Sequence, residues 1–237
     1  MDRGDPDDGA QDTGALTHAR AAMVRDQLIA RGIADLAVLR AMGSIPRERF
    51  VPEAEAAQAY LDGAQAIGHG QTISQPWIVA RMTEVLDLPG WRARHPGPAP
   101  AVLDVGTGSG YQAAVLAAIG ARVTTIERDP ALSARAAGVL SGLGYHVHAV
   151  VGDGSDGYAP DAPYAGIIVG AAAPAIPLPL LAQLAPGGRL VLPVGPRGLQ
   201  ELVVAWMEDG EVRTAALGGC VFVPLIGRHG QPGMSDD

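Results

Sequence analysis

The chain has 237 residues and a net charge of −8, and all 17 of its basic residues are arginine. The acidic balance argues against a nucleic-acid partner, which needs a basic face, and the lack of lysine excludes a G-x-x-x-x-G-K phosphate loop. A hydrophobic content of 48% suits one α/β domain with a sizeable core, and the only cysteine, Cys220, excludes an internal disulfide and a cysteine-based zinc site.

The chain carries no signal for export or for a membrane. No apolar run is long enough to cross a bilayer, and the first residues lack the basic and then apolar pattern of a secretory signal. The single cysteine makes a reduced cytoplasm the simplest location. We also expect a monomer that works without a membrane and without a metal ion.

The first predicted segment is a tail. Residues 1–17 are rich in aspartate and glycine, and we expect them to be disordered and dispensable. Residues 18–98 are predicted to form a helical region and a loop. Gly32 is expected to end one helix, and Pro76 is expected to begin another that runs to Leu86.

After a predicted linker at 89–100, strands alternate with helices. We place strands at 101–105, 122–126, 146–151, 166–169 and 189–193, and helices at 111–119, 130–143 and 178–184. This alternation predicts a parallel sheet with helices on both faces over residues 99–230. Residues 201–207 and 212–217 are expected to form an antiparallel pair that turns at Asp209-Gly210, and residues 231–237 a flexible end.

The strongest local motif is the glycine-rich turn after the first of these strands. It reads Asp104-Val105-Gly106-Thr107-Gly108-Ser109-Gly110. Glycines let the backbone turn sharply and let a ligand approach the main chain, and ligands in open α/β sheets bind at the carboxyl ends of the strands. A dinucleotide fingerprint is not excluded, since the frame that starts at Gly108 ends on Ala113.

Two further acidic positions follow the next strands. Glu127 ends the second strand, where it can accept hydrogen bonds from both hydroxyls of a ribose. Asp153 and Gly154 end the third strand, where we expect the carboxylate to lie near an adenine amino group. The three positions in this order resemble the motifs of class I methyltransferases. That resemblance implies a Rossmann-like three-layer α/β/α sandwich, with N-terminal helices and a C-terminal antiparallel strand pair, that binds S-adenosylmethionine.

A second group of motifs is more specific. Its members are Pro46–Val51, the loop Gly68-His69-Gly70-Gln71-Thr72-Ile73-Ser74-Gln75-Pro76, Ala80–Glu84, Asp104–Gly110, Gly152–Gly154, Leu192–Gly195 and Phe222–Leu225. In these the chain resembles the protein-L-isoaspartate (D-aspartate) O-methyltransferases over nearly everything after the tail.

The resemblance implies a reaction and a site. The family methylates the free α-carboxylate of isoaspartyl residues in damaged proteins and peptides, and the ester then closes to a succinimide without enzymatic help. It implies that Ser74 is the active-site serine and that Thr72 and Ile73 line the cofactor, with Ser74 beside it. Taken alone, Ser74 is better explained as a cap of the helix that begins at Pro76, and within the full loop capping and substrate contact are compatible.

The chain departs from the family at three positions near the fourth strand. Ala165 stands where aspartate is usual, Gly170 where threonine is usual, and Ala175 where glutamate is common. These departures leave a second hypothesis open, in which the chain methylates a normal aspartate of a ribosomally made peptide as a tailoring step. A non-catalytic protein that binds S-adenosylmethionine is the third hypothesis.

Overall fold

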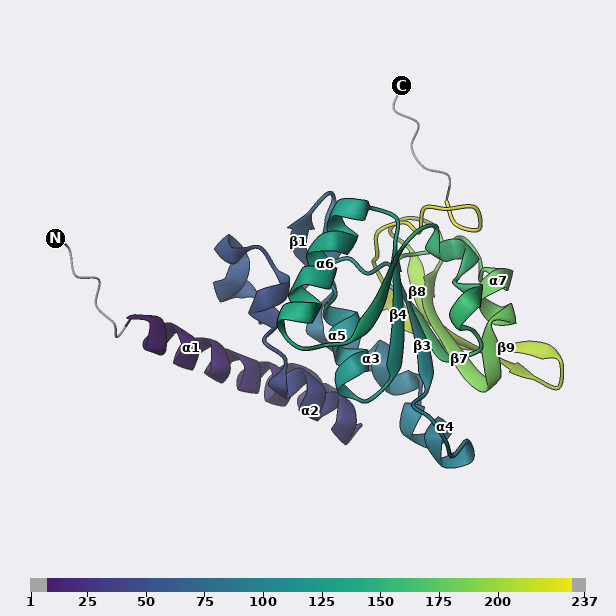
Figure 1. Ribbon diagram of the computed structural model, residues 1–237, viewed down its shortest axis with the longest axis horizontal. Coiled ribbons are helices and arrows are strands. Elements are labelled where there is room, and N and C mark those ends of the chain that lie inside the picture. The colour runs from purple at the N-terminus through teal and green to yellow at the C-terminus, as the bar shows by residue number, and fades with distance from the viewer. Residues whose placement is uncertain (1–7, 232–237) are drawn as a thin grey trace, which may run out of the picture.

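The computed structural model describes residues 8–231, and its centre is one twisted sheet of seven strands (Figure 1). The strands lie in the order β5-β4-β3-β6-β7-β8-β9. Their bounds are β3 (Ala101–Val105), β4 (Arg122–Glu127), β5 (Val147–Val151), β6 (Tyr164–Val169), β7 (Leu184–Val194), β8 (Gln200–Glu208) and β9 (Glu211–Cys220). The first five strands pair in parallel, and β8 and β9 add antiparallel, which confirms the predicted fold class.

Helices cover both faces of this sheet. The helices α2 (Leu36–Ser44), α3 (Pro76–Val85), α5 (Tyr111–Ala118) and α6 (Pro130–Gly142) share one hydrophobic cluster, and α7 (Leu178–Ala182) belongs to another. Strand β6 separates the two clusters, because Ile168 packs into the first and Ile167 and Val169 into the second. This alternation has the period of two that a strand buried on both faces requires.

The order in which strands are added to the sheet reverses beside β3. From β3 the chain moves outward through β4 and β5, and it then returns to the other side of β3 with β6. Such a reversal leaves a crevice at the carboxyl ends of the two central strands, and this is where open α/β sheets bind ligands. Gly106 after β3 and Gly170 after β6 therefore face the same crevice.

The N-terminal region is more ordered than the sequence analysis expected. Helix α1 (Asp8–Ala22) begins at Asp8, so the prediction of a disordered tail over residues 1–17 is wrong for residues 8–17. Leu16 and Ala19 pack partly against the core, which extends the helix toward the start of the chain. A π-helical and a 3-10 segment continue it to Gly32, whose φ of 88° ends it as predicted. Residues 1–7 and 232–237 lie outside the described residues.

A hairpin and a helix were not predicted. The glycine loop around His69 is the turn of a hairpin, made by β1 (Gln65–Gly68) and β2 (Gln71–Ile73). The expected linker at 89–100 begins inside helix α4 (Leu88–Arg94), which the Asp87 carboxylate caps by accepting a hydrogen bond from Gly90 N. A proline in the first turn fits a helix start, so Pro89 does not break this helix.

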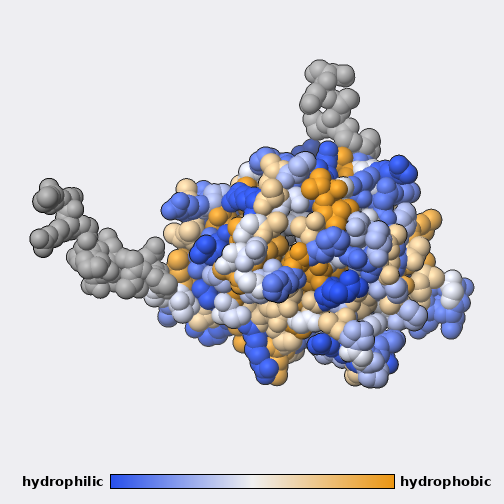
Figure 2. Space-filling view, viewed as in Figure 1, coloured by the Kyte–Doolittle hydropathy of each residue, from blue (hydrophilic) through white to orange (hydrophobic). Residues whose placement is uncertain are grey.

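The surface mixes hydrophilic and hydrophobic residues, with hydrophobic surface near the middle of the face shown and below the C-terminal trace (Figure 2). Single exposed apolar side chains, such as Leu178 and Val221, are ordinary on a protein surface. Among residues 8–231 we find no helix that combines the length and the apolar character needed to span a bilayer.

Candidate active site

The glycine turn after β3 forms the floor of the site. Gly106, Gly108 and Gly110 all have a positive φ, of 88°, 51° and 87°. Residues with a side chain rarely adopt this conformation, which explains the glycines. At Gly110 space is also restricted, because a Cβ there would lie 3.2 Å from the Cβ of Ala136 in α6. The turn thus exposes its backbone to the crevice and lets α5 pack closely on α6.

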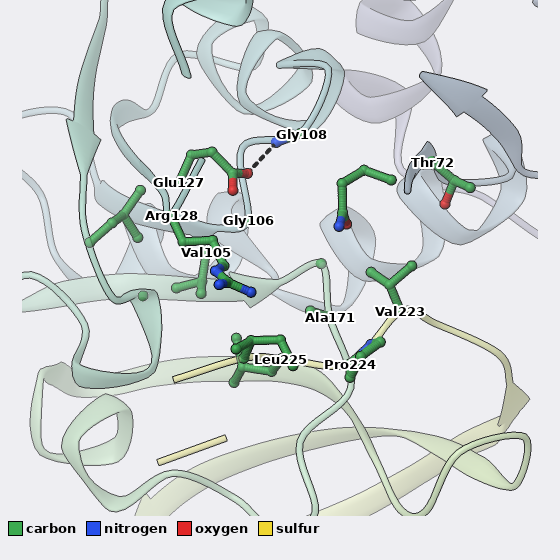
Figure 3. Close-up of a pocket in the computed structure, with 15 residues that line it drawn as sticks. Thr72, Val105, Gly106, Gly108, Glu127, Arg128, Ala171, Val223, Pro224 and Leu225 are labelled. Atoms are coloured by element: carbon green, nitrogen blue, oxygen red, sulfur yellow. Dashed lines mark hydrogen bonds between the residues drawn. The ribbon is translucent and has the colours of Figure 1, made fainter. Parts of the chain in front are cut away.

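Glu127, the last residue of β4, lies against this turn. One carboxylate oxygen accepts a hydrogen bond from Gly108 N at 3.0 Å (Figure 3). The other accepts one from Asp129 N at 3.1 Å. The side chain is almost buried, and it lines a cavity of about 610 Å³, open mouth included. The backbone fixes both oxygens at the cavity wall, where each keeps room to accept a ligand hydroxyl.

Asp104, at the end of β3, is buried below the turn. Its Oδ2 accepts a hydrogen bond from the Thr125 hydroxyl at 2.9 Å, whereas its Oδ1 is buried and has no partner among the described residues. Burial raises the pKa of Asp104 to about 7, and the charge of Glu127 adds to the effect. A buried oxygen without a partner calls for a donor from a ligand.

Asp153 follows β5 and is held by three hydrogen bonds. Its Oδ1 accepts hydrogen bonds from the backbone N and the hydroxyl of Ser155, and its Oδ2 accepts one from Arg228 N at 2.7 Å. The expected contact of Asp153 with an adenine stays a prediction, and Asp153 is not among the residues that line the Glu127 cavity. These bonds hold the pKa of Asp153 below its usual value. Asp153 thereby ties down the C-terminal segment, while Gly154 reaches the Glu127 cavity.

The C-terminal segment forms a wall that sequence reasoning missed. Val223, Pro224, Leu225 and Ile226 line the Glu127 cavity opposite the hairpin, with Ala171 beside them (Figure 3). A parallel bridge between Ala172 and Pro224 brings this segment to the end of β6. The sequence analysis singled out Phe222–Leu225 as a motif, but only the tertiary structure places this segment beside the cofactor motifs.

Three adjoining cavities share the hairpin residue Thr72 and the strand-end residue Gly170. The Glu127 cavity leads into an inner cavity, which Ile73, Asp104, Gly108, Tyr111 and Gln112 help to line. The inner cavity adjoins an outer one, which Ala64, Gln75, Ile78, Cys220 and Phe222 help to line. Ser74 borders both the inner and the outer cavity.

The structure bears on one of the roles considered for Ser74, the capping of helix α3, and its role toward the substrate stays a prediction. Helix α3 begins after Gln75 as its N-cap residue, and no side chain caps it. Ser74 therefore does not cap this helix. The alternative, a hydroxyl at the boundary between two cavities, is what the fold provides.

Only one of the three departures from the family borders the cavities. Ala165 is buried in the core and Ala175 is exposed away from them. Gly170 lines all three cavities, and a Cβ at this position would lie 3.4 Å from Gly106 O, so a side chain can be accommodated. The departures at Ala165 and Ala175 leave the crevice unchanged.

Comparison with known proteins assigns the family. The family model described as protein-L-isoaspartate (D-aspartate) O-methyltransferase matches residues 19–230. The chain belongs to this family. It is 51% identical over 215 residues to the protein-L-isoaspartate O-methyltransferase of Methanoculleus marisnigri, covering 90% of this chain and 94% of that one. With protein-L-isoaspartate O-methyltransferase 2 of Marinobacter nauticus it shares 50% identity, over 92% of this chain and 97% of that one.

Two solved structures resemble this chain in fold. A protein-L-isoaspartate O-methyltransferase superposes with a TM-score of 0.75 at 25% identity, over 89% of this chain and 67% of that one. A second structure, of a putative family member from Plasmodium falciparum in complex with S-adenosyl-L-homocysteine, has a TM-score of 0.72 at 23% identity. It covers 87% of this chain and 98% of that one, and it supports the fold. The described residues contain no cluster of potential metal ligands.

Proposed function

We propose that this chain transfers a methyl group from S-adenosylmethionine to the free α-carboxylate of L-isoaspartyl residues in damaged proteins and peptides. The observation that carries the proposal is the junction of three cavities at Thr72 and Gly170. A methyl transfer needs a cofactor side and a substrate side that meet at one point, and Thr72 and Gly170, which line all three cavities, mark such a point.

The residues of the first two cavities fit the cofactor. Glu127 is suited to accept hydrogen bonds from two ribose hydroxyls, and Gly154 lines the same cavity. The unpartnered Oδ1 of Asp104 suits a positively charged donor, and S-adenosylmethionine carries both an ammonium and a sulfonium. When bound, this group supplies an electrophilic methyl carbon to the junction.

The chemistry requires little from the protein beyond position. A carboxylate is already a nucleophile at neutral pH, so no strong base is needed. Holding the reacting atoms in line can lower the barrier by up to about 7–11 kcal/mol. The Ser74 hydroxyl, at the boundary of the inner and outer cavities, is suited to donate a hydrogen bond to one carboxylate oxygen while the other attacks. Ser74 acts here as an orienting group and forms no covalent intermediate.

The outer cavity is suited to a peptide. It is wide, at about 780 Å³ with its open mouth, and it is lined largely by small and apolar residues of the hairpin and the β9 end. In isoaspartate the free carboxylate sits on the α-carbon, and the main chain runs through the former side chain. A site that fixes the backbone and the carboxylate together distinguishes the isomers by geometry.

We infer two further properties. The protein works as a monomer, as the resemblance to the family led us to expect. It is cytoplasmic, since its only cysteine, Cys220, is free and needs no oxidising compartment.

The decisive experiment compares an isoaspartyl peptide with its aspartyl twin, with S-adenosylmethionine as the methyl donor. We expect methylation of the isoaspartyl peptide and at least a hundredfold slower methylation of the twin, because a displacement of about 1 Å can cost this much in rate. Equal methylation of both would favour the tailoring of a normal aspartate. Methylation of neither, despite tight cofactor binding, would favour a non-catalytic protein.

A further inference from the structure

Arg47 is a buried cation directly behind the substrate side of the site. It begins the short 3-10 helix that ends at Phe50, and its side chain is fully buried (0% exposed). Its Nε donates a hydrogen bond to Ala59 O at 2.7 Å, and its Nη2 donates one to Ser74 O at 2.7 Å. The guanidinium carbon lies 4.8 Å from the centre of the Tyr111 ring. Its Nη1 is buried and has no hydrogen-bond partner among the described residues.

No carboxylate in the described part of the chain forms an ion pair with this guanidinium. The neighbouring Glu48 pairs instead with Arg20, at 3.4 Å, and accepts a hydrogen bond from the Tyr60 hydroxyl. Burial lowers the pKa of Arg47, but an arginine stays protonated inside a protein. Buried charges are usually paired, because an unpaired one is costly to remove from water. Two carbonyl oxygens and the Tyr111 ring stabilise the Arg47 guanidinium, but no carboxylate among the described residues pairs with its charge.

The cavities beside Arg47 lack a basic side chain of their own. The inner cavity contains one charged side chain, the acidic Asp104, and the outer cavity is lined by uncharged side chains alone. A peptide carboxylate that enters this junction meets no basic side chain at the surface. Ser74 and Tyr111, both of which line the inner cavity, are the residues that Arg47 contacts from behind. The positive charge is therefore one layer of residues from the place where the carboxylate must bind.

We propose that Arg47 is a positioning residue that holds the Ser74 backbone and supplies the positive charge against which the substrate carboxylate binds. The inference rests on the proposed function, since it assigns the charge that selects an anionic substrate. A low dielectric strengthens such an interaction, and a buried charge is screened little by salt. Arg47 does not touch the substrate, so its effect falls on peptide binding more than on the methyl transfer step.

The test compares two ligands of nearly the same shape that differ in charge and in one acceptor oxygen, and the variants below isolate the part that depends on Arg47. One is an isoaspartyl peptide, and the other is its isoasparaginyl twin, in which a neutral carboxamide replaces the carboxylate. Their dissociation constants are measured by calorimetry in the presence of saturating S-adenosylhomocysteine, which prevents turnover and removes the sulfonium charge. We expect the wild-type protein to prefer the carboxylate at least tenfold and to keep this preference between 0.05 and 0.5 M salt. A wild-type preference below twofold would overturn the inference, whether or not any variant folds.

Variants of Arg47 distinguish an effect of its charge from an effect of its support of the Ser74 backbone. Arg47→Gln should lose most of the carboxylate preference, whereas Arg47→Lys should keep it. Arg135 is a matched control, because it is exposed and its Nη1 donates to Ile67 O in the same hairpin at 3.0 Å. Arg135→Gln should leave the preference unchanged. If Arg47→Gln weakens both peptides equally, Arg47 only supports the loop and the inference fails.

The same measurements keep the two hypotheses apart. If the wild-type protein fails to methylate the isoaspartyl peptide, the proposed function is wrong. If it methylates this peptide and the carboxylate preference survives in Arg47→Gln, only the role of Arg47 is wrong.

Discussion

Replacing Glu127 by alanine tests the assignment of the cofactor site most directly. Glu127 is 7% exposed, and Gly108 N and Asp129 N donate hydrogen bonds to its two carboxylate oxygens at 3.0 and 3.1 Å. These two bonds exist before any ligand arrives, so they fix the carboxylate in place without a cost at the moment of binding. The alanine variant removes both acceptors from the cavity wall.

The expected loss of cofactor affinity follows from the two hydrogen bonds that the ribose hydroxyls would donate to the charged Glu127 carboxylate. Each is worth about 1.5–3 kcal/mol, so the lower bound for both is about 3 kcal/mol. At about 1.4 kcal/mol per factor of ten, the dissociation constant should rise roughly a hundredfold. Glu127→Gln keeps one acceptor oxygen and should lose roughly tenfold, because the hydrogen bonds that remain lack the charge.

The assay is calorimetric titration with S-adenosylhomocysteine, with a thermal melt to confirm that each variant is folded. Asp161→Ala is the control, since Asp161 also accepts a hydrogen bond beside the sheet, from Thr124 at 2.6 Å, but lies outside the three cavities. Its affinity should match that of the wild-type protein. An unchanged affinity in the folded Glu127→Ala variant would refute the ribose assignment.

Three further outcomes are expected. Because the pKa of Asp104 is raised to about 7, its ionised form becomes populated as the pH rises from 6 to 8, so affinity for the positively charged cofactor should rise over this range. Asp104→Asn should show a flat profile by calorimetry, and an equal rise in that variant would contradict the assignment. Ser74→Ala should lower turnover on the isoaspartyl peptide at least tenfold and change the dissociation constant of S-adenosylhomocysteine less than twofold; the reverse pattern would place Ser74 on the cofactor side. A protein that starts at Thr17 should fold and stay active, with a slightly lower melting temperature because the partial packing of Leu16 is lost, and a loss of activity would assign a role to residues 1–16.

The local signals in the sequence were sufficient for the sheet and for the glycine turn. Strand β3 begins and ends where it was predicted, and Gly110, with its positive φ, directly precedes α5 as the motif required. These predictions depend on neighbours within a few residues, such as runs of apolar side chains, glycines and a proline at a helix start. The order of Asp104 and Glu127 along the chain was informative for a similar reason, because parallel strands bring their carboxyl ends to one edge.

Contacts between distant segments could not be predicted in this way. The sequence did not predict that the chain returns to Asp153 75 residues later, where Arg228 N donates a hydrogen bond to its carboxylate. Arg47 was part of a motif with no assigned role until the fold placed its guanidinium against Ser74, 27 residues away. A carboxylate or a guanidinium has the same sequence signature whether it faces a ligand, a backbone or solvent. The packing of the whole chain decides which of these it meets, because burial and the pairing of charges depend on residues that the local sequence does not contain.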